Sequence, residues 1–410
     1  MRRRATAWLG TISLLTSACA MGSGVAGTAT TTSSSTSTTT TTTTTMVVPT
    51  TTTTTPPTTT TSSTTTTTTT TLPATTTTTE PLDVERMARS ILMVGIPGTT
   101  LDAATDEHLA AGGRSVILFG GNVADATTLR ALTSDIACSA GQPVLVAVDQ
   151  ELSPLVRRLG PSLVTPLPTP ATATGMSTTE LREVGSRLGA ELLDLGINLN
   201  LAPVLDVVQG PNPVLQGRSL GDDPELVAEL GAALIEGIQE AGVAAVAKHF
   251  PGHGRSLTDP HTGVTVIDAD GDTLADVDWI PFEAAVDAGA LALMVGHPIY
   301  TELDPDLPAS LSPAVLDLLR DDFGFDGVAI TDSLTMAAVT TERTQGEVVV
   351  AALAAGEDLL LVPAPDAVGP SVAAIVAAVQ SGDVPVRRLQ EAVERVDALT
   401  SAVGAVSCDA

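Results

Sequence analysis

Val243-Ala-Ala-Val-Ala-Lys-His-Phe-Pro-Gly-His-Gly254 is the stretch of this chain from which we infer the fold. Its first five residues are apolar without alternation, which is typical of a strand buried on both faces. Lys248 and His249 follow the apolar run, and Pro and Gly then end the strand. Lys248 is the only lysine in the chain, and three of the five histidines lie between residues 249 and 261. A cation and several imidazoles at the exit of a buried strand indicate a functional site.

Eight apolar runs of this kind, bounded by Gly, Pro or Asp, are predicted as strands: 91–97, 115–119, 144–149, 197–203, 243–249, 291–297, 327–332 and 358–363. Amphipathic segments predicted as helices lie between most of them: 125–137, 178–195, 224–241, 274–288, 312–323 and 344–355. Eight strands alternating with helices over roughly 300 residues fit an α/β fold, the (β/α)8 barrel of the TIM type. The alternative is an open doubly wound sheet, but no glycine fingerprint follows the first predicted strand.

Polar residues stand at the ends of successive predicted strands. The third to seventh runs are followed, at or near their ends, by Asp149, Asp206, Lys248 with His249, His297 and Asp332. In a (β/α)8 barrel the carboxyl ends of the strands converge on one face, where the active sites of such enzymes lie. Random placement would scatter these residues, so their positions predict an enzyme.

The N-terminal part of the chain predicts export. Residues 1–19 resemble a bacterial lipoprotein signal peptide, because three arginines precede a short apolar run and small residues precede Cys19, which cleavage would leave lipidated. Residues 20–80, mainly uncharged Thr, Ser and Pro, are predicted to be a disordered linker, and 81–404 a single folded domain. We expect the protein in the cell envelope, lipid-anchored to the outer face of the cytoplasmic membrane or secreted.

Acidic residues outnumber basic ones by 47 to 19, for a net charge of −28. This charge disfavours nucleic acid and anionic lipid as partners of the domain surface. The lipid anchor is therefore the expected contact with a membrane. We expect the protein to be a monomer.

The spacing of the three cysteines predicts no zinc site. If Cys19 carries lipid, Cys138 and Cys408 can form a disulfide, because the first and last elements of a closed barrel are neighbours. A metal-dependent hydrolase is an alternative, with ligands from His249, His253, His261 and Asp332. Such barrels usually carry a His-x-His pair on the first strand, which has no histidine here, so we expect no metal and no cofactor.

Two groups have the chemistry of catalysis. Asp332 is a carboxylate delivered from a buried strand, which suits a nucleophile, although an Asp at a strand end is also a common N-cap. Asp259 stands two residues before His261, a spacing at which the carboxylate can bond one imidazole nitrogen and fix the tautomer. His261 would then carry a proton near neutral pH; a solvated loop histidine is the alternative.

Two segments resemble the bacterial β-N-acetylhexosaminidases of glycoside hydrolase family 3. They are Lys248 to Gly254 with Asp259-Pro-His261, and Thr331-Asp-Ser-Leu-Thr-Met336. Segments 148–151, 200–206 and 217–224 agree, so the resemblance spans residues 83–403. It implies a nucleophile at Asp332, which forms a glycosyl-enzyme with configuration retained, and an acid/base dyad of Asp259 and His261. It also implies a set of residues that hold the hydroxyls of a non-reducing N-acetylglucosamine: Asp149, Arg157, Arg218, Lys248 and His249.

Two departures from the family pattern concern the site. The family commonly reads Asp-Gln-Glu-Gly-Gly-Arg after the third strand, whereas this chain reads Asp149-Gln-Glu-Leu-Ser-Pro154. Pro260 stands where serine is common in the dyad motif, and proline narrows the backbone freedom of that loop.

The predicted function is a retaining exo-β-N-acetylglucosaminidase that releases terminal N-acetylglucosamine from peptidoglycan fragments or related glycans. A β-glucosidase or a phosphorylase of the same family is one alternative. Another is a non-catalytic lipoprotein that binds wall glycans. The altered loop after Asp149 favours this last alternative, and the presence of Asp259, His261 and Asp332 disfavours it.

Overall fold

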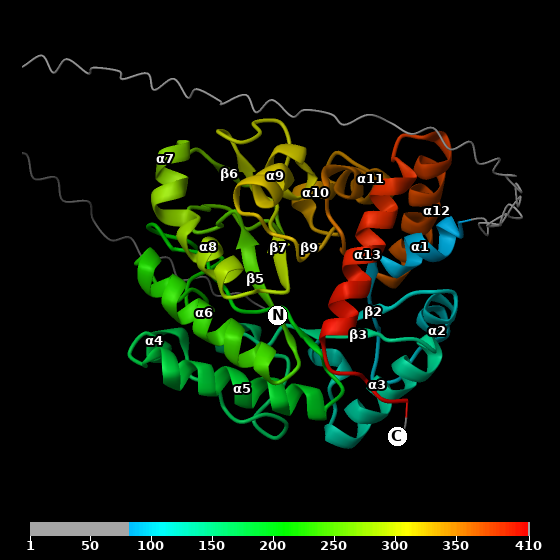
Figure 1. Ribbon diagram of the computed structural model, residues 1–410, viewed down its shortest axis with the longest axis horizontal. Helices are drawn as coiled ribbons and strands as arrows, with labels where there is room; N and C mark the ends of the chain where they lie inside the picture. The colour runs from blue at the N-terminus through cyan, green and yellow to red at the C-terminus, as the bar shows by residue number, and fades with distance from the viewer. Residues whose placement is uncertain (1–81, 409–410) are drawn as a thin grey trace, which may run out of the picture. The chain divides into compact units, whose positions relative to one another are not determined.

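The computed structural model describes residues 82–408, and eight parallel strands in this range form a barrel (Figure 1). The strands are β1 (Leu92–Gly95), β2 (Ser115–Leu118), β3 (Leu145–Val148), β4 (Leu199–Asn200), β5 (Ala244–Phe250), β7 (Ala292–Val295), β9 (Val328–Thr331) and β10 (Leu360–Val362). Their order is β10-β1-β2-β3-β4-β5-β7-β9, and a parallel bridge between Ile330 and Leu359 brings the two ends of the sheet together. Each strand overlaps one of the eight predicted runs, and the predicted (β/α)8 barrel is confirmed.

Helices surround the barrel on the outside (Figure 1). The longer ones are α2 (Ala103–Ala110), α3 (Ala126–Ala140), α5 (Thr178–Asp194), α6 (Pro224–Glu240), α8 (Ile280–Asp287), α11 (Gln345–Ala355), α12 (Pro365–Ser381) and α13 (Val386–Ala402). The shorter ones are α1 (Val84–Ser90), α4 (Pro170–Ala173), α7 (Gly271–Thr273), α9 (Pro313–Asp317) and α10 (Ala337–Thr340). A small parallel sheet of β6 (Val266–Ile267) and β8 (Ile299–Tyr300) ties the loop after β5 to the segment after β7.

Two predicted helices are interrupted in the structure. Segment 274–288 begins as a π-helix at Leu274–Asp278 before α8, and segment 312–323 consists of α9 followed by a π-helix at Leu318–Asp322. The Trp279 amide closes the first wide turn by donating to the Leu274 carbonyl. Pro281 has no amide hydrogen and is tolerated only in a first turn, so α8 starts anew just before it.

The helix starts on either side of β4 follow from their N-cap residues. Ser177 forms a capping box with Glu180 at the start of α5, and Asp223 caps α6 ahead of Pro224. The two helices pack closely, because a Cβ added at Gly237 would lie 2.1 Å from the backbone carbonyl oxygen of Arg182.

Apolar side chains form one cluster inside the barrel and another between the barrel and the helices. In β5, for example, Val246 belongs to the inner cluster and Ala247 to the outer one, as the alternation along a strand requires. Burial of each Val or Leu side chain contributes about 1.5–3 kcal/mol. Val396 and Leu399 of α13 join the inner cluster, so α13 covers one end of the barrel.

A buried ion cluster lies at that covered end, on the amino-terminal side of β10. The Asp358 carboxylate lies 2.5 Å from the Arg320 guanidinium, 2.6 Å from that of Arg388 and 3.2 Å from that of Arg395. Residues at this end of a (β/α)8 barrel contribute to stability rather than to chemistry. The neighbouring Glu357 is fully buried, and neither of its carboxyl oxygens has a hydrogen-bond partner among residues 82–408.

A disulfide joins Cys138 of α3 to Cys408 near the C-terminus, with 4.7 Å between the Cα atoms. The predicted signal peptide (1–19, with Cys19) and linker (20–80) lie outside the described residues. Within residues 82–408, no helix is both long and apolar enough to cross a membrane.

Candidate active site

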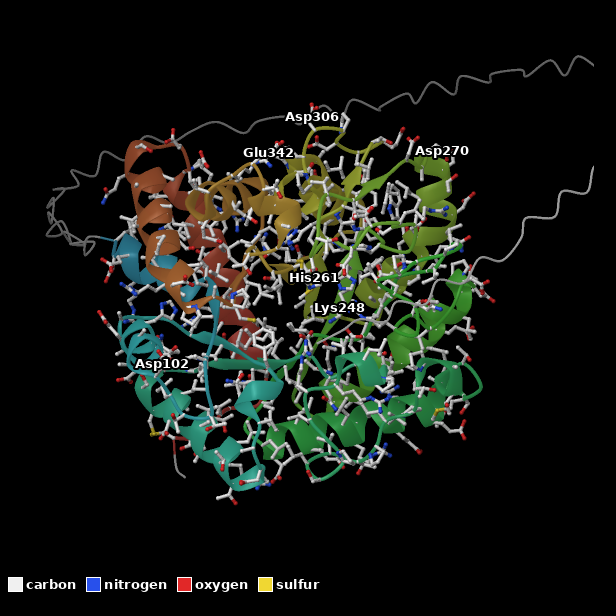
Figure 2. All side chains as sticks on the ribbon, turned by 180° about the vertical axis from the view of Figure 1, so that it is seen from behind. Asp102, Lys248, His261, Asp270, Asp306 and Glu342 are labelled. Atoms are coloured by element: carbon white, nitrogen blue, oxygen red, sulfur yellow. A yellow bond between two sulfur atoms is a disulfide. The ribbon has the colours of Figure 1, made fainter. Side chains whose placement is uncertain are left out.

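A cavity of about 430 Å³ opens at the carboxyl ends of the strands. Its charged and imidazole side chains are Asp149, Arg158, Arg218, Lys248, His249, His253, His261 and Asp332. They come from the end of β5 and from the segments that follow β3, β4, β5 and β9, so residues far apart in the sequence meet at one face of the barrel. Figure 2 labels Lys248 and His261 of this set near the middle of the molecule.

Lys248 lies at the centre of an ion cluster at the base of the cavity. Its Nζ atom is 3.0 Å from Asp149 Oδ1 and 2.9 Å from Glu151 Oε1, and its side chain is almost completely buried. Burial lowers the pKa of Lys248, but the two carboxylates outweigh burial and raise it above its usual value. The ammonium group therefore stays charged, and its compact shape lets it bridge two carboxylates.

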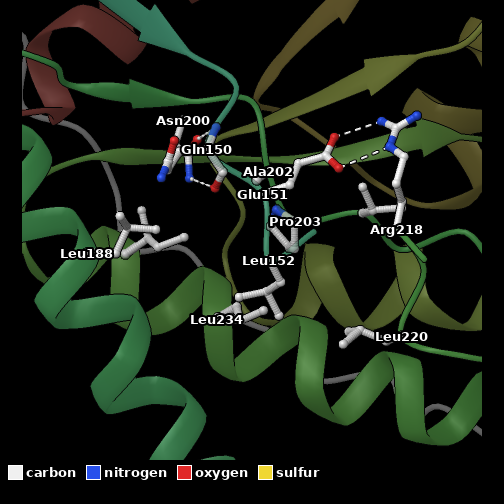
Figure 3. A pocket seen from close by; sticks show the side chains of 12 residues that line it. Gln150, Glu151, Leu152, Leu188, Asn200, Ala202, Pro203, Arg218, Leu220 and Leu234 are labelled. Carbon is white, nitrogen blue, oxygen red and sulfur yellow. Dashed lines mark hydrogen bonds and ion pairs between the residues drawn. The ribbon is translucent and has the colours of Figure 1, made fainter. Parts of the chain in front are cut away.

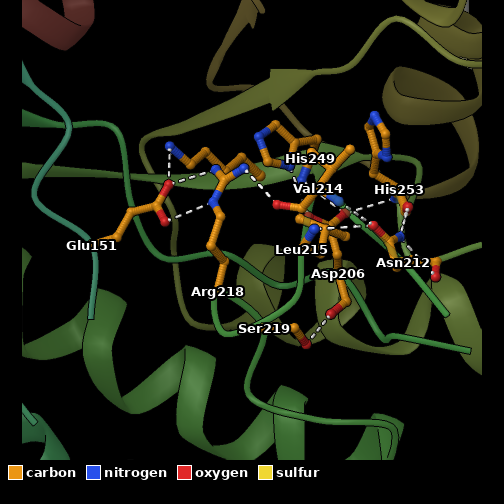
Figure 4. A network of polar contacts seen from close by, with 12 residues as sticks. Glu151, Asp206, Asn212, Val214, Leu215, Arg218, Ser219, His249 and His253 are labelled. Atoms are coloured by element: carbon orange, nitrogen blue, oxygen red, sulfur yellow. Dashed lines mark hydrogen bonds and ion pairs between the residues drawn. The ribbon is translucent and has the colours of Figure 1, made fainter. Parts of the chain in front are cut away.

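Glu151 forms ion pairs with both Lys248 and Arg218. The Arg218 guanidinium donates to its two carboxylate oxygens at 3.0 and 2.7 Å (Figure 4). Although burial raises the pKa of Glu151, Lys248 and Arg218 lower it to about 2. Glu151 also lines a small void of about 20 Å³, together with Leu188 and Leu234 among others (Figure 3). The sequence alone indicated no role for Glu151.

The arginine that lines the cavity next to Asp149 is Arg158, whereas Arg157 was expected there. Arg158 Nη2 lies 3.2 Å from Asp149 Oδ2, and the Arg158 guanidinium stacks over the Phe119 ring at 5.7 Å. The Arg157 guanidinium instead donates to backbone carbonyls of Glu151, Leu152, Leu167 and Pro168. In the structure Arg157 clamps the loop, and its neighbour Arg158 reaches the cavity.

Side-chain hydrogen bonds of Gln150 hold the altered loop after β3 in place. The Gln150 side chain accepts hydrogen bonds from the Arg158 and Leu159 amides at 2.9 Å and donates to the Leu159 carbonyl at 3.1 Å. Gln150 also pairs with Arg157 in an antiparallel bridge. These bonds close a hairpin that is folded back with Arg158 in the cavity.

Asp206 orients His249. Its Oδ2 lies 2.7 Å from His249 Nδ1, and its Oδ1 accepts hydrogen bonds from the amides of His249 and His253 at 3.2 and 2.6 Å (Figure 4). Burial raises the pKa of Asp206, but His249 and these bonds lower it to about 2. The carboxylate fixes the tautomer with the proton on Nδ1, as carboxylates that support a functional imidazole do.

The Pro-Gly-His-Gly turn after β5 requires its glycines. Gly252 has φ of +119°, and a Cβ added at Gly254 would lie 1.8 Å from the Val207 carbonyl oxygen. The turn leaves His253 buried, with neither ring nitrogen bonded to any group in residues 82–408. Burial lowers the pKa of His253 to about 4, so this imidazole is neutral at pH 7.

Asp332 follows β9 and lines the cavity. Its Oδ1 accepts a hydrogen bond from the Ser333 amide at 2.7 Å. Burial raises the pKa of Asp332, but His297, His249, the Ser333 amide and Lys248 outweigh burial and hold it below its usual value. The next helix, α10, has Met336 as its N-cap residue, so Asp332 does not cap a helix.

Asp259 and His261 form a pair on the loop between β5 and β6. Asp259 Oδ1 lies 2.7 Å from His261 Nδ1 and also accepts from the His261 amide at 2.9 Å. The His261 side chain lines the cavity but is 62% exposed, so the pair stands at the cavity mouth. The Pro260 carbonyl accepts from the Ala338 amide at 3.2 Å, which joins this loop to α10.

The proposed metal ligands of the alternative reading do not form a metal-binding group in the described part of the chain. Among residues 82–408, no three His, Cys, Asp or Glu side chains gather in a way that could hold a metal ion. Asp206 binds His249, Asp259 binds His261, and His297 is bonded to Ser310 and to the Ser333 carbonyl.

Residues 93–399 match the model of the glycosyl hydrolase family 3 N-terminal domain. The chain is 40% identical over 276 residues to a β-hexosaminidase of Tolumonas auensis, an alignment that covers 66% of this chain and 81% of the relative. It is 34% identical over 293 residues to a β-hexosaminidase of Xanthomonas campestris, which covers 70% and 88% of the two chains.

Solved structures have the same architecture. A family 3 β-N-acetylglucosaminidase from a Paenibacillus species superposes with a TM-score of 0.76 at 33% identity, over 78% of this chain and 63% of that one. The chain thus spans less than two thirds of that protein. A β-N-acetylhexosaminidase from Beutenbergia cavernae superposes with a TM-score of 0.72 at 32% identity, over 78% and 99% of the two chains.

Proposed function

This chain belongs to glycosyl hydrolase family 3 and is a glycoside hydrolase; from that premise we propose that it is a retaining exo-β-N-acetylglucosaminidase. The observation that carries the proposal is the meeting of Asp332, His261 and the Lys248 ion cluster around one cavity. The cavity volume of about 430 Å³ lies within the range of small-ligand sites. A single terminal sugar fits such a site, which favours exo action.

In the first step of the proposed reaction, an Asp332 carboxylate oxygen attacks the anomeric carbon of the terminal sugar. The glycosidic C–O bond breaks as His261 donates its proton to the leaving oxygen, which departs as an alcohol. The lowered pKa of Asp332 keeps the carboxylate anionic, as a nucleophile must be. The product of this step is a glycosyl-enzyme ester on Asp332.

In the second step, neutral His261 takes a proton from water as the water oxygen attacks the same anomeric carbon. The ester bond to Asp332 breaks, the sugar leaves with its original configuration, and His261 is again protonated. Asp259 bonds Nδ1 of His261, so the other ring nitrogen, Nε2, is left to exchange the proton.

The charged cluster accounts for recognition of the terminal sugar. Asp149, Arg158, Lys248, Arg218 and His249 line the cavity and offer fixed donors and acceptors for hydroxyl groups. Each charged hydrogen bond contributes about 1.5–3 kcal/mol. Glu151 and Asp206 hold these donors in place before substrate arrives, which reduces the entropy lost on binding.

We propose peptidoglycan fragments or related glycans as substrates. The lipoprotein-like residues 1–19 and the uncharged Thr-rich segment that follows support a lipid-anchored or secreted protein of the cell envelope, where such glycans lie. A tether of about 50 residues reaches roughly 40 Å as a flexible coil, enough to hold a catalytic domain off a membrane.

The test is hydrolysis of 4-nitrophenyl N-acetyl-β-D-glucosaminide, measured beside the corresponding β-D-glucoside. We expect turnover of the N-acetyl substrate, loss of that turnover in Asp332→Asn, and little turnover of the glucoside. Preference for the glucoside would place the protein among β-glucosidases. No turnover of either substrate by folded protein would support the binding lipoprotein.

A further inference from the structure

The cavity is lined by the ion cluster around Lys248 and by apolar residues, some of which belong to the barrel interior. Pro260, Met336 and Ala337 are the apolar lining residues that lie on the acid/base loop and on the segment after Asp332. Met336 and Ala337 remain partly exposed in the structure, so their surfaces are open to a ligand, whereas Pro260 is largely buried. Thr335, which also lines the cavity, bonds the Ser333 hydroxyl at 2.9 Å.

These apolar residues are connected to the proton donor. Pro260 stands between Asp259 and His261, and its carbonyl accepts a hydrogen bond from the Ala338 amide at 3.2 Å. That bond joins the acid/base loop directly to the segment that follows Asp332 and contains Met336 and Ala337. All three apolar residues line the same cavity as His261.

The position of the proton donor determines what these residues face. His261 must reach the glycosidic oxygen, and the leaving group begins at that oxygen. A leaving group that extends past His261 toward the cavity mouth therefore lies against Pro260 and Met336. None of the three residues has a charged or hydrogen-bonding side chain, so the contact contributes by removing apolar surface from water.

We propose that Pro260, Met336 and Ala337 form a leaving-group subsite that selects glycosides whose aglycone has an apolar surface, such as an aryl group or the C–H face of a second sugar. This inference rests on the proposed function, because it takes the Lys248 cluster as the site of the terminal sugar. Pro260 then has a positive role, since serine at this position would present a hydroxyl to the aglycone.

The test compares binding of phenyl and methyl 1-thio-β-N-acetylglucosaminide by calorimetry. Thioglycosides resist hydrolysis, so the ratio of their Kd values measures the aglycone contact without any effect of leaving-group acidity. We expect the phenyl compound to bind the wild-type protein about tenfold more tightly, which corresponds to about 1.4 kcal/mol. We expect this ratio to fall to about threefold or less in Met336→Gln and in Pro260→Ser.

Met336→Leu is the matched control, because it keeps the apolar surface and should keep the ratio. Unchanged binding of the methyl compound in all variants would verify the fold and the sugar site. Equal binding of the two compounds by the wild-type protein, or an unaltered ratio in Met336→Gln, would overturn the subsite. Failure of both compounds to bind would instead contradict the proposed function, and the subsite with it.

Discussion

Lys248 Nζ lies 2.9 Å from Glu151 Oε1, and both side chains are almost completely buried. Because Glu151 also binds the Arg218 guanidinium, one carboxylate holds two of the cations that line the cavity. Removal of one partner from such a cluster leaves a buried charge without compensation.

We expect Glu151→Gln to lower the free energy of unfolding by about 3–5 kcal/mol, the usual effect of breaking a buried ion pair. It should also lower kcat/KM by about 10-fold or more, since Lys248 and Arg218 lose their fixed positions. Urea denaturation and steady-state kinetics measure the two effects. The matched control is Glu236→Gln, which breaks an exposed pair with Arg182 and should change stability by less than about 1 kcal/mol. Similar effects of both substitutions would contradict this role of Glu151.

Arg157 and Arg158 should respond differently to substitution. Arg158→Ala removes a donor from the cavity, so we expect kcat/KM to fall about 10- to 100-fold with little change in Tm. Arg157→Ala leaves the carbonyls of Leu167 and Pro168 without this donor, so we expect stability to fall by about 1–3 kcal/mol. Kinetics of the folded variants and thermal denaturation separate the two roles. A larger kinetic effect at Arg157 would restore it as the sugar-binding residue.

The barrel could be predicted from the sequence because most of its strands are short apolar runs that alternate with amphipathic helices. The resemblance to the hexosaminidases of family 3 is confirmed by the match to the family model and by the 40% identical relative. Helices α12 and α13 were not predicted. Pro370 stands inside α12, and the helix accommodates it.

The resemblance implied Arg157 as the sugar-binding arginine, and the structure places Arg158 in the cavity. A family motif cannot distinguish two adjacent arginines when the loop before them differs from the family pattern. The Gln150 hydrogen bonds decide which of the two faces the cavity, and these depend on the folded hairpin. Asp206 and Glu151 were within quoted motifs, but their partners are 43 and 97 residues distant in sequence at His249 and Lys248.

The free energy of unfolding at low pH should depend on the ionisation of the Asp206 carboxyl group. Burial raises its pKa, but His249 lowers it to about 2, below the value of about 3.9 in an unfolded chain. The unfolded state therefore binds more protons between these values, and stability is lost as the pH falls from about 4 to about 2. We expect the free energy of unfolding of Asp206→Asn to fall by about 2 kcal/mol less than that of the wild type when the pH is lowered from 5 to 2. Urea denaturation at the two pH values measures this difference. Identical pH dependence of the two proteins would contradict the assignment.

The ionisation of Glu357 should change stability with pH in the opposite direction to that of Asp206. Burial, together with the neighbouring Asp358 carboxylate, raises the pKa of Glu357 well above its usual value. The folded state then keeps a proton that the unfolded state releases, so this group lowers stability as the pH rises above about 4.3. Glu357→Gln keeps the shape without the ionisation, and we expect a higher Tm than wild type at pH 8 and an equal Tm at pH 4. Asp358→Asn, which weakens three arginine pairs, should lower Tm at both pH values. A lower Tm of Glu357→Gln at pH 8 would mean that the carboxylate is ionised and bound by those arginines.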